Sequence, residues 1–432
     1  MRLSVLLAIA ISLFTPTTPA EDWPQFRGPG GRAVSETATP PVGFGPTSNL
    51  VWKVTIPEGY SSPIVTGRRI FLTAATEGKL ETLGLDRKDG RVLWRKPVSA
   101  DKPDPTKNLQ ATSTPVTDGK FVYAFFGSFG LVAYDLEGVE QWRQPLAKPD
   151  LEANTSPILI HDKLIIVCDR EAGSFIEAHD AKTGRTLWRA ERPQFLRSRA
   201  TPFHWVHGKA EELIVPGSFR LTSYDPLTGR ENWGYSGAAR FATSSPAAGE
   251  NLLFSASSSY GVGEGGGGDG SVSVPLVPYS NQSTKPKPPK AESAVLAIRP
   301  GGSGDLAETQ LAWKSTNSPP YASSPLYYQG RLFTIKEGGL LSAYAVKNGH
   351  PIYQDEPINA PGDYWASAVA AAGRIYFSSH YGAVTVINAT TDKPVILAQN
   401  KLGEEILATP ALYDQTILLR TATNLYSFGT DQ

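Results

Sequence analysis

A short motif, two small residues that are usually Ser or Thr followed by proline, recurs eight times along this chain of 432 residues. Ser61-Ser62-Pro63 is one full copy, and the later copies end at positions 115, 157, 202, 246, 325, 368 and 410, the copy at 368 lacking its proline. The usual step is about 43 residues, and one step is about 79. A fixed period of this length is typical of a propeller built from repeated small sheets.

A second marker lies about thirty residues into most units. Its fullest copy runs from Ala178 to Trp188, with the sequence Ala-His-Asp-Ala-Lys-Thr-Gly-Arg-Thr-Leu-Trp. Asp accepts hydrogen bonds from a turn, Gly supplies a positive φ, and the aromatic residue follows on a strand, so the marker predicts a hairpin. β-rich runs such as residues 120–126 separate the two markers. We therefore predict an all-β, eight-bladed propeller with four antiparallel strands in each blade.

The two ends of the chain suggest how the ring closes. The last unit contains strand-like segments up to residues 424–428 but no fourth strand, whereas a spare fourth-strand marker occurs at residues 50–53. We predict that this N-terminal strand completes the last blade, so residues 50–432 form one domain. Residues 21–49 are expected to form an extension, and removal of residues 21–45 is expected to have little effect on stability because they are rich in Gly, Pro and Thr.

The first twenty residues resemble an export signal, with Arg2, an apolar run over residues 3–14 and small residues before position 21. We expect an exported protein, periplasmic or secreted. The single cysteine, Cys168, excludes an intrachain disulfide, and no cysteine near the cleavage site is available for lipid attachment. Later segments are too short to span a membrane as an apolar helix, and we expect a monomer.

The charge balance and the local composition indicate which partners and which segments to expect. The chain has 41 basic and 41 acidic residues, a balance that disfavours nucleic acid or an anionic membrane as partner. Residues 257–292 in the fifth unit are biased toward Gly, Ser, Pro and Lys, which predicts a flexible insertion and explains the long step. An idle loop and a partner-binding arm are both compatible with this composition.

The pattern Ala-x-Asp-x-x-Thr-Gly-x-x-x-Trp at residues 178–188 resembles the repeat of the pyrroloquinoline quinone (PQQ) propeller superfamily, and the similarity extends over residues 50–428. The segment 22–29 resembles the opening of exported bacterial members. The superfamily includes quinoprotein alcohol and glucose dehydrogenases, and also the non-catalytic propeller lipoprotein of the outer-membrane β-barrel assembly machine. The resemblance implies that repeated tryptophans pack between blades, namely Trp52, Trp94, Trp142, Trp188, Trp233 and Trp313.

The resemblance also raises an enzymatic alternative, a PQQ-dependent dehydrogenase that oxidises alcohols or sugars, or a degenerate relative of one. Such enzymes characteristically have a vicinal cysteine pair, which one cysteine cannot supply. They also use calcium held by oxygen ligands, and the candidates Asp169 and Glu171 belong to one hairpin without obvious partners. We expect no catalytic residue, metal or cofactor, and PQQ with calcium is the alternative.

One face of such a ring gathers the turns between second and third strands and the connections from each blade to the next. These segments contain many basic and aromatic residues: Arg170, Glu171, Arg197, Arg199, Arg220, Arg240, Lys336, Trp365, His380, Tyr381 and Arg420. Guanidinium groups interspersed with aromatic rings suit carboxylates and peptides. We predict a non-catalytic scaffold whose arginine-rich face binds an envelope protein, a peptide or a small anionic ligand. A structural scaffold that uses its blade edges is a further alternative.

Overall fold

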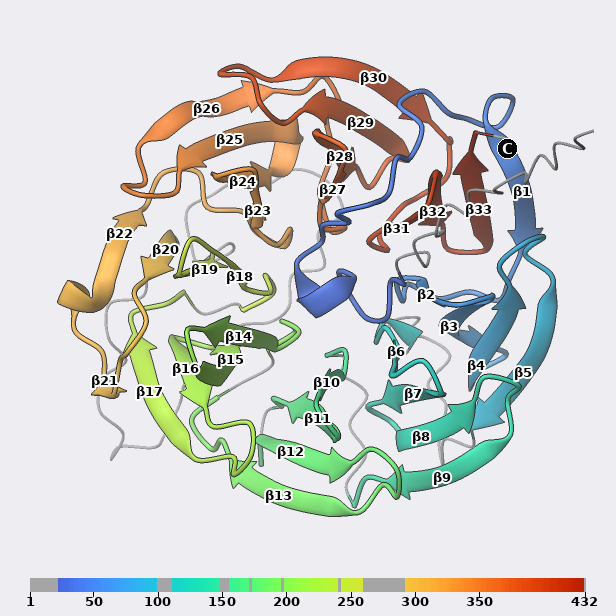
Figure 1. The fold of residues 1–432 in the computed structure, drawn as a ribbon, viewed down its shortest axis with the longest axis horizontal. Coiled ribbons are helices and arrows are strands. Elements are labelled where there is room, and N and C mark those ends of the chain that lie inside the picture. Colours follow the sequence, from blue (N-terminus) through green and yellow to red (C-terminus); the bar gives the residue numbers. More distant parts are fainter. Residues whose placement is uncertain are drawn as a thin grey trace, which may run out of the picture.

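The computed structural model describes residues 22–98, 111–147, 155–170, 173–195, 198–239, 242–258 and 292–430. In this part of the chain, eight mainly antiparallel sheets stand radially around one axis (Figure 1). This arrangement confirms the eight-bladed propeller expected from the repeat. None of the described helices is long and apolar enough to cross a membrane.

The strands follow one another from the axis outward in blades 1 to 7. Blade 1 contains β2 (Ile64–Thr66), β3 (Arg69–Thr76), β4 (Lys79–Asp86) and β5 (Val92–Val98), and blade 2 contains β6 (Val116–Thr117), β7 (Phe121–Phe126), β8 (Gly130–Asp135) and β9 (Glu140–Pro145). Blade 3 contains β10 (Ile158–Ile160), β11 (Lys163–Cys168), β12 (Phe175–Asp180) and β13 (Thr186–Glu191), and blade 4 contains β14 (Phe203–His207), β15 (Ala210–Gly217), β16 (Arg220–Tyr224) and β17 (Glu231–Ser236). Blade 5 contains β18 (Ala247–Gly249), β19 (Leu252–Ser257), β20 (Ala294–Ile298) and β22 (Leu311–Ser315), and blade 6 contains β23 (Leu326–Tyr328), β24 (Arg331–Lys336), β25 (Leu340–Ala345) and β26 (Pro351–Pro357). Blade 7 contains β27 (Val369–Ala371), β28 (Arg374–Ser378), β29 (Ala383–Asn388) and β30 (Val395–Lys401), and blade 8 contains β31 (Ala411–Tyr413), β32 (Thr416–Arg420), β33 (Asn424–Gly429) and β1 (Leu50–Thr55).

The two central strands of each blade supply most of the core, because they are covered by a neighbouring blade on both sides. In β7, five of six residues are buried, whereas no residue of the outer strand β9 is fully buried. Cys168 at the end of β11 is buried, as its apolar strand predicts. Most of the insertion predicted over residues 257–292 lies outside the described residues, and β19 ends and β20 begins close to its predicted boundaries.

The recurring tripeptide forms a ring of hydrogen bonds around the axis. The backbone N–H of Thr409 donates to the Ser62 hydroxyl of the next blade at 3.0 Å, and Ser62 N–H donates to Thr114 at 2.9 Å. The same bond joins Thr114 to Ser156, Thr201 to Ser245, Ser245 to Ser324, Ser324 to Ser367, and Ser367 to Thr409. At these seven junctions a backbone donor of one blade meets a hydroxyl acceptor of its neighbour, which explains why the motif repeats.

The repeated tryptophans join each blade to the next. Trp52 Nε1 donates to the Arg87 carbonyl at 3.3 Å, and Gly90 of the same turn leaves room for the indole ring, which a Cβ would approach to 2.5 Å. The equivalent bonds join Trp94 to Leu136, Trp142 to Ala181, Trp188 to Pro226, and Trp313 to Val346. The inter-blade role is thus confirmed for these five tryptophans.

Trp233 departs from this pattern. Its Nε1 donates to the Glu212 carboxylate of its own blade at 2.5 Å rather than to a carbonyl of the next blade. The reason is the longer connection in blade 5, where β21 (Gly304–Asp305) pairs in parallel with β17 and takes the place of the short turn. Trp233 is nevertheless buried, so its structural role holds with a different partner.

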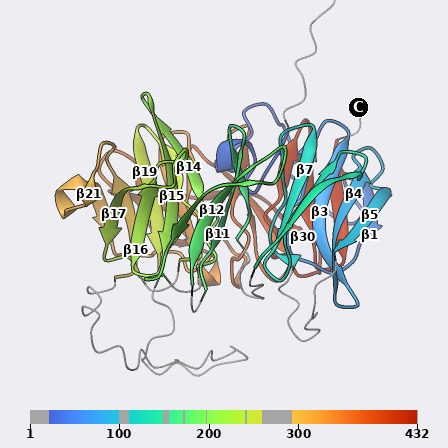
Figure 2. The same cartoon turned by 90° about the horizontal axis from the view of Figure 1, so that it is seen from below.

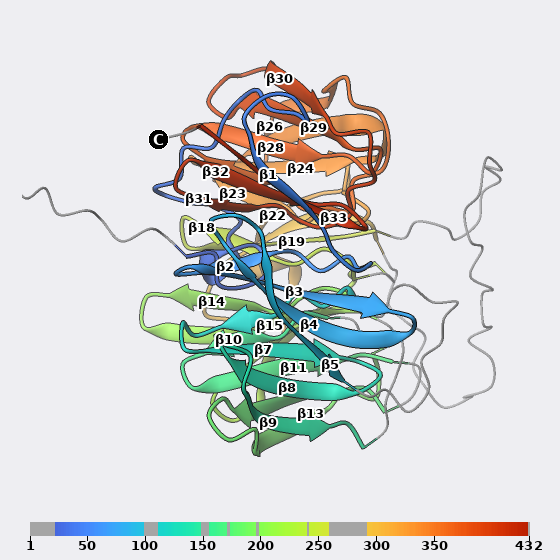
Figure 3. The ribbon, with the colours of Figure 1, turned by 90° about the vertical axis from the view of Figure 1, so that its right-hand side faces the viewer.

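The ring closes where the sequence predicts. β1 pairs antiparallel with β33, with Leu50 opposite Phe428 and Thr55 opposite Asn424 (Figure 3). Glu404, in the connection between blades 7 and 8, reinforces this junction. Its carboxylate accepts a hydrogen bond from Lys53 of β1 at 3.0 Å and others from Thr421, Asn424 and Tyr426 of the last blade.

These contacts make the closure sensitive to acid. Partial burial raises the pKa of Glu404, but the four hydrogen bonds outweigh that effect and hold the pKa at about 2. Because the folded pKa lies below the ordinary value of 4.5, the carboxylate stabilises the fold above about pH 4.5, and this stabilisation is lost as the pH falls toward 2.

We expect Glu404→Gln to lower the free energy of unfolding by about 1 to 3 kcal/mol at pH 7 and by much less near pH 2. Urea unfolding across this range, with the exposed Glu77→Gln as control, measures the difference. A deficit that is the same at every pH would contradict the prediction.

Residues 22–49, which we call the axial segment, are more closely packed than the loose extension expected from their composition. The segment crosses the centre of the ring, where the short helix η1 (Pro29–Gly31) lies (Figures 1 and 2). Trp23 is completely buried and Phe44 nearly so, and both belong to the core cluster that includes blades 1, 6, 7 and 8. Trp23 is bridged to Val65 in the inner strand of blade 1, whereas the Phe44 ring packs against Phe428 of blade 8.

The axial segment is bonded to blades 1 and 7, the two blades that flank blade 8. The Asp22 carboxylate accepts hydrogen bonds from Thr66 and Gly67 of blade 1, at 2.6 and 2.9 Å. In blade 7, the Ala370 carbonyl accepts a hydrogen bond from Ser35 N–H at 3.0 Å. Further along, Phe44 N–H donates to the Asn400 side chain of the same blade at 2.9 Å.

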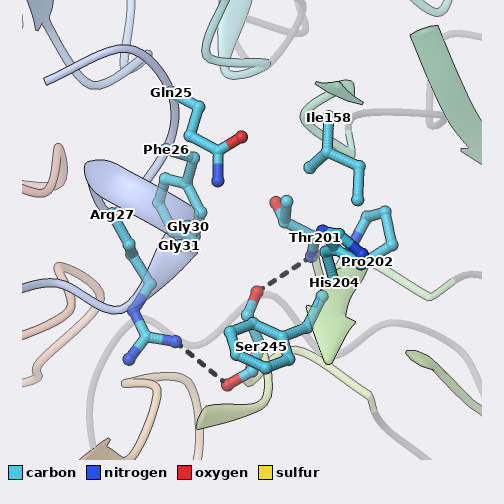
Figure 4. A pocket seen from close by; sticks show the side chains of 11 residues that line it. Gln25, Phe26, Arg27, Gly30, Gly31, Ile158, Thr201, Pro202, His204 and Ser245 are labelled. Atoms are coloured by element: carbon cyan, nitrogen blue, oxygen red, sulfur yellow. Dashed lines mark hydrogen bonds between the residues drawn. The ribbon is translucent and has the colours of Figure 1, made fainter. Parts of the chain in front are cut away.

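Arg27 anchors the middle of the axial segment. Its buried guanidinium donates to the Pro246 carbonyl of blade 5 at 2.8 Å and to the Pro325 carbonyl of blade 6 at 2.6 Å. Figure 4 shows the side chain reaching Ser245, whose hydroxyl in turn receives the bond from Thr201. Burial lowers the pKa of Arg27 to about 9. The cavity beside it is only about 10 Å³, room for about one water molecule.

Candidate binding face

The loop face is the side of the ring that carries the turns between second and third strands and the connections between blades. Asp22 is bonded to the turn between the first and second strands of blade 1, so the axial segment begins at the opposite face. The predicted site residues therefore belong to the side away from that entry. Glu171, Arg197 and Arg240 lie outside the described residues.

Arg420 is on a loop-face strand end, but its side chain points into the protein. The guanidinium is fully buried and donates to the Ser61 carbonyl at 3.0 Å and to the Thr73 carbonyl at 2.8 Å. Burial lowers its pKa to about 9. Arg420 thus joins blade 8 to blade 1, and the structure does not present it to a ligand.

Arg220 is likewise held within its own blade. Its guanidinium pairs with Glu231 at 2.8 Å and with Asp305 at 2.7 Å, and it lies over the backbone of Gly234 in β17. The side chain therefore extends toward the outer strand and away from the axis.

Two predicted arginines lie on the loop face near the junction of blades 3 and 4. Arg199 is exposed, and its backbone N–H donates to the Ala242 carbonyl at 2.9 Å. The Arg170 guanidinium lies 4.9 Å from the centre of the Phe175 ring and donates to the Gly173 carbonyl at 3.1 Å. In the described residues, the arginine-rich character of the face is confined to this sector.

Arg192 forms a buried ion pair that the sequence did not predict. Its guanidinium forms a two-pronged pair with Asp169 at 2.8 and 2.9 Å, and both side chains are 0% exposed. It also donates to the Tyr224 hydroxyl at 2.7 Å and lies 3.8 Å from the centre of the Phe195 ring. The spacing of Asp169 and Arg192 in the sequence does not predict this pair, because the two residues come together only when the ends of two strands of blade 3 meet in the fold.

The Arg192 pair bears on the calcium alternative. Both oxygens of Asp169 accept hydrogen bonds from one guanidinium, so this carboxylate does not fit the role of a calcium ligand. Across the described ranges, no three His, Cys, Asp or Glu side chains are grouped so that they could hold a metal ion. Of the two candidate calcium ligands, Asp169 is thus occupied by Arg192, and Glu171 lies outside the described residues.

The opposite sector of the loop face carries exposed aromatic side chains. We call Tyr321, Trp365 and Tyr381 the aromatic patch. Trp365 is 39% exposed and Tyr381 is 71% exposed, and the rings of Tyr321 and Trp365 meet edge to face at 5.5 Å. Tyr321 and Trp365 precede the inner strands of blades 6 and 7, and Tyr381 lies in the turn between β28 and β29.

The predicted cations beside the aromatic patch are paired with carboxylates. His380 Nε2 lies 3.0 Å from Glu405, and its ring meets Tyr381 edge to face at 5.4 Å. Lys336 Nζ lies 3.0 Å from Asp355. The described part of the face therefore contains a sector with Arg199 and a sector dominated by aromatic and acidic groups, a division that the predicted arginine-rich face did not include.

Comparisons with solved structures show the same fold. BamB from Moraxella catarrhalis superposes with a TM-score of 0.60 at 12% identity, over 88% of this chain and 99% of that chain. A europium-containing methanol dehydrogenase gives 0.63 at 11% identity, over 95% and 98%. The quinohemoprotein alcohol dehydrogenase from Comamonas testosteroni gives 0.60 at 11% identity, over 95% and 81%. BamB and the two dehydrogenases are thus about equally similar to this chain in fold.

A search of curated proteins returned no match to this chain. Residues 44–169 and 150–264 match the family described as outer membrane protein assembly factor BamB, and together they cover just over half of the sequence. The chain therefore belongs to this family of PQQ-like β-propellers.

Proposed function

We propose that the protein is an exported, non-catalytic scaffold that binds a protein or peptide of the cell envelope on its loop face. The observation that carries the proposal is the aromatic patch. Trp365 and Tyr381 are the two aromatic residues among the large hydrophobic side chains exposed in the described part of the chain, and both occur on this one face. Exposed aromatic rings gathered at one place are typical of partner-binding surfaces.

The chemistry of the rest of the face supports a macromolecular partner. Arg199, in the connection between blades 3 and 4, offers an exposed guanidinium for a carboxylate on the partner, whereas Trp365 lies in the connection between blades 6 and 7. The axis itself is filled by the axial segment, with Arg27 bonded to carbonyls of blades 5 and 6. A partner that lies across the face would contact both sectors.

Site-specific crosslinking tests the proposal. The full chain would carry Tyr381→p-benzoylphenylalanine, and a matched variant would carry Val206→p-benzoylphenylalanine on the opposite face, where Val206 is 59% exposed. Irradiation in an envelope extract of the cells that make the protein should give a discrete adduct at position 381 and none at 206. Identical adducts at both positions, or none at 381, would overturn it.

The dehydrogenase alternative makes a different prediction. Because Asp169 is occupied by Arg192, we expect that adding PQQ and calcium to the purified protein will produce no dye-linked oxidation of alcohols or sugars. Absorption spectroscopy after gel filtration should likewise show no retained quinone. Turnover that requires both PQQ and calcium would contradict the non-catalytic assignment.

A further inference from the structure

Two carboxylates beside the aromatic patch point to the chemistry of the partner. Glu337 lies in the turn between β24 and β25, and Asp363 lies in the connection from blade 6 to blade 7. A backbone bond of 3.0 Å from Gly338 N–H to the Gly362 carbonyl joins these two segments, so the carboxylates are brought close together. Partial burial, reinforced by the negative charge of Asp363, raises the pKa of Glu337.

The neighbouring cations compensate this pair only in part. The positive charge of Lys336 lowers the pKa of Glu337, but by less than the charge of Asp363 raises it. Within the described part of the chain, the ion pairs of Lys336 and His380 go to Asp355 and Glu405. Two like charges on adjacent loops repel each other, and a cation between them would relieve the repulsion. A protein surface that compensates such a pair only in part is suited to a positively charged group on a partner.

The side chains of Trp365 and Tyr381 belong to segments next to these carboxylates, where aromatic rings would help to bind a cation. The Asp363 carbonyl accepts the His380 N–H at 2.8 Å, which connects this loop to the turn that carries Tyr381. The Tyr381 ring packs against Gly362, at which a Cβ would come within 2.8 Å of the ring, so only glycine permits this close approach. Trp365 follows Asp363 by two residues. Aromatic faces attract ammonium and guanidinium groups through cation–π interactions.

We infer that Glu337, Asp363, Trp365 and Tyr381 together form a subsite that binds a lysine or arginine side chain of the partner. This inference rests on the proposed function and specifies it. It also changes the expected charge of the bound group. The sequence predicted an anion on this face, whereas this sector binds a cation and only the sector with Arg199 binds an anion. A partner segment with separated basic and acidic residues would match both sectors.

Fluorescence anisotropy with defined peptides tests the subsite on the full chain. The probes are fluorescein-labelled five-residue peptides with a central arginine or lysine, and a twin in which neutral citrulline replaces arginine. We expect the charged peptides to bind about 5- to 10-fold more tightly than the twin. The double variant Glu337→Gln/Asp363→Asn should abolish this difference, and Glu77→Gln, an exposed acidic position on the same face in blade 1, should preserve it.

The outcomes separate this inference from the proposed function. Equal binding of the citrulline twin, or an unchanged preference in the double variant, would overturn the cation subsite even if the crosslink at position 381 persists. Loss of that crosslink would instead overturn the proposed partner face. Trp365→Ala/Tyr381→Ala should weaken all three peptides, and retention of full affinity in this variant would also overturn the subsite. Circular dichroism checks that each variant retains the fold.

Discussion

A chain that begins at residue 46 is expected to lose more than about 5 kcal/mol of unfolding free energy, although it retains β1. The physical reason is the burial of the axial segment, in which Trp23 is 0% exposed and Phe44 is 4% exposed. Removal of one large buried aromatic side chain typically costs about 3 to 5 kcal/mol, and whole domains are stable by only about 5 to 15 kcal/mol. The truncated chain would therefore be unfolded or nearly so.

Urea unfolding followed by circular dichroism measures this loss. Because the truncated chain could aggregate, the single variant Trp23→Ala provides a second measurement, with an expected loss of about 3 to 5 kcal/mol. Leu227→Ala serves as the matched control, since Leu227 is 56% exposed in a turn of blade 4. A truncated chain with an unchanged urea midpoint would show that the segment covers the ring without stabilising it.

The second large effect is expected at the closure. Trp52→Ala should lower the unfolding free energy by about 3 to 5 kcal/mol, because Trp52 is nearly buried and bonds to the Arg87 carbonyl of blade 1. The loss falls on the one junction that joins distant parts of the chain. Unfolding should therefore begin between β1 and β33, which hydrogen exchange would detect as early loss of protection at residues 424–428.

The control for this experiment is Trp365→Ala, a tryptophan that is 39% exposed on the loop face. It should change stability by less than about 1 kcal/mol. If Trp52→Ala costs no more than Trp365→Ala, the closing strand is held by its backbone pairing alone, and the repeated tryptophan is not needed at this junction.

The architecture was predictable because each sequence repeat corresponds to one packing unit. The copies of the tripeptide form hydrogen bonds between neighbouring blades, and the Asp-to-Trp hairpins form most of the other inter-blade contacts. Eight copies therefore predicted eight blades, and the spare strand predicted the closure. Trp233 could not be assigned its partner in this way, because the β21 pairing that redirects it lies in an irregular connection.

The site was predictable only in part, because position at a strand end does not fix the direction of a side chain. Arg420, at the end of the second strand of blade 8, and Arg199, in the connection between blades 3 and 4, were both expected on the loop face, yet one is buried against carbonyls and the other is exposed. Asp363 attracted no attention in the sequence because its significance depends on Glu337 in another loop. The packing of the axial segment could not be predicted from its Gly and Pro content, because Trp23 is buried beside Val65 of blade 1 and Phe44 against Phe428 of blade 8, far along the chain.

The axial segment also constrains the order in which the protein can mature. Residues 22–49 are synthesised before the blades, yet this segment is bonded to Ala370 of blade 7, and β1 pairs with β33 of the last blade. Native packing of the axial segment must therefore await synthesis of all eight blades. Until then Trp23 and Phe44 are exposed, a state in which chains tend to aggregate. A protein built in this way depends on protection of its N-terminal region between synthesis and ring closure.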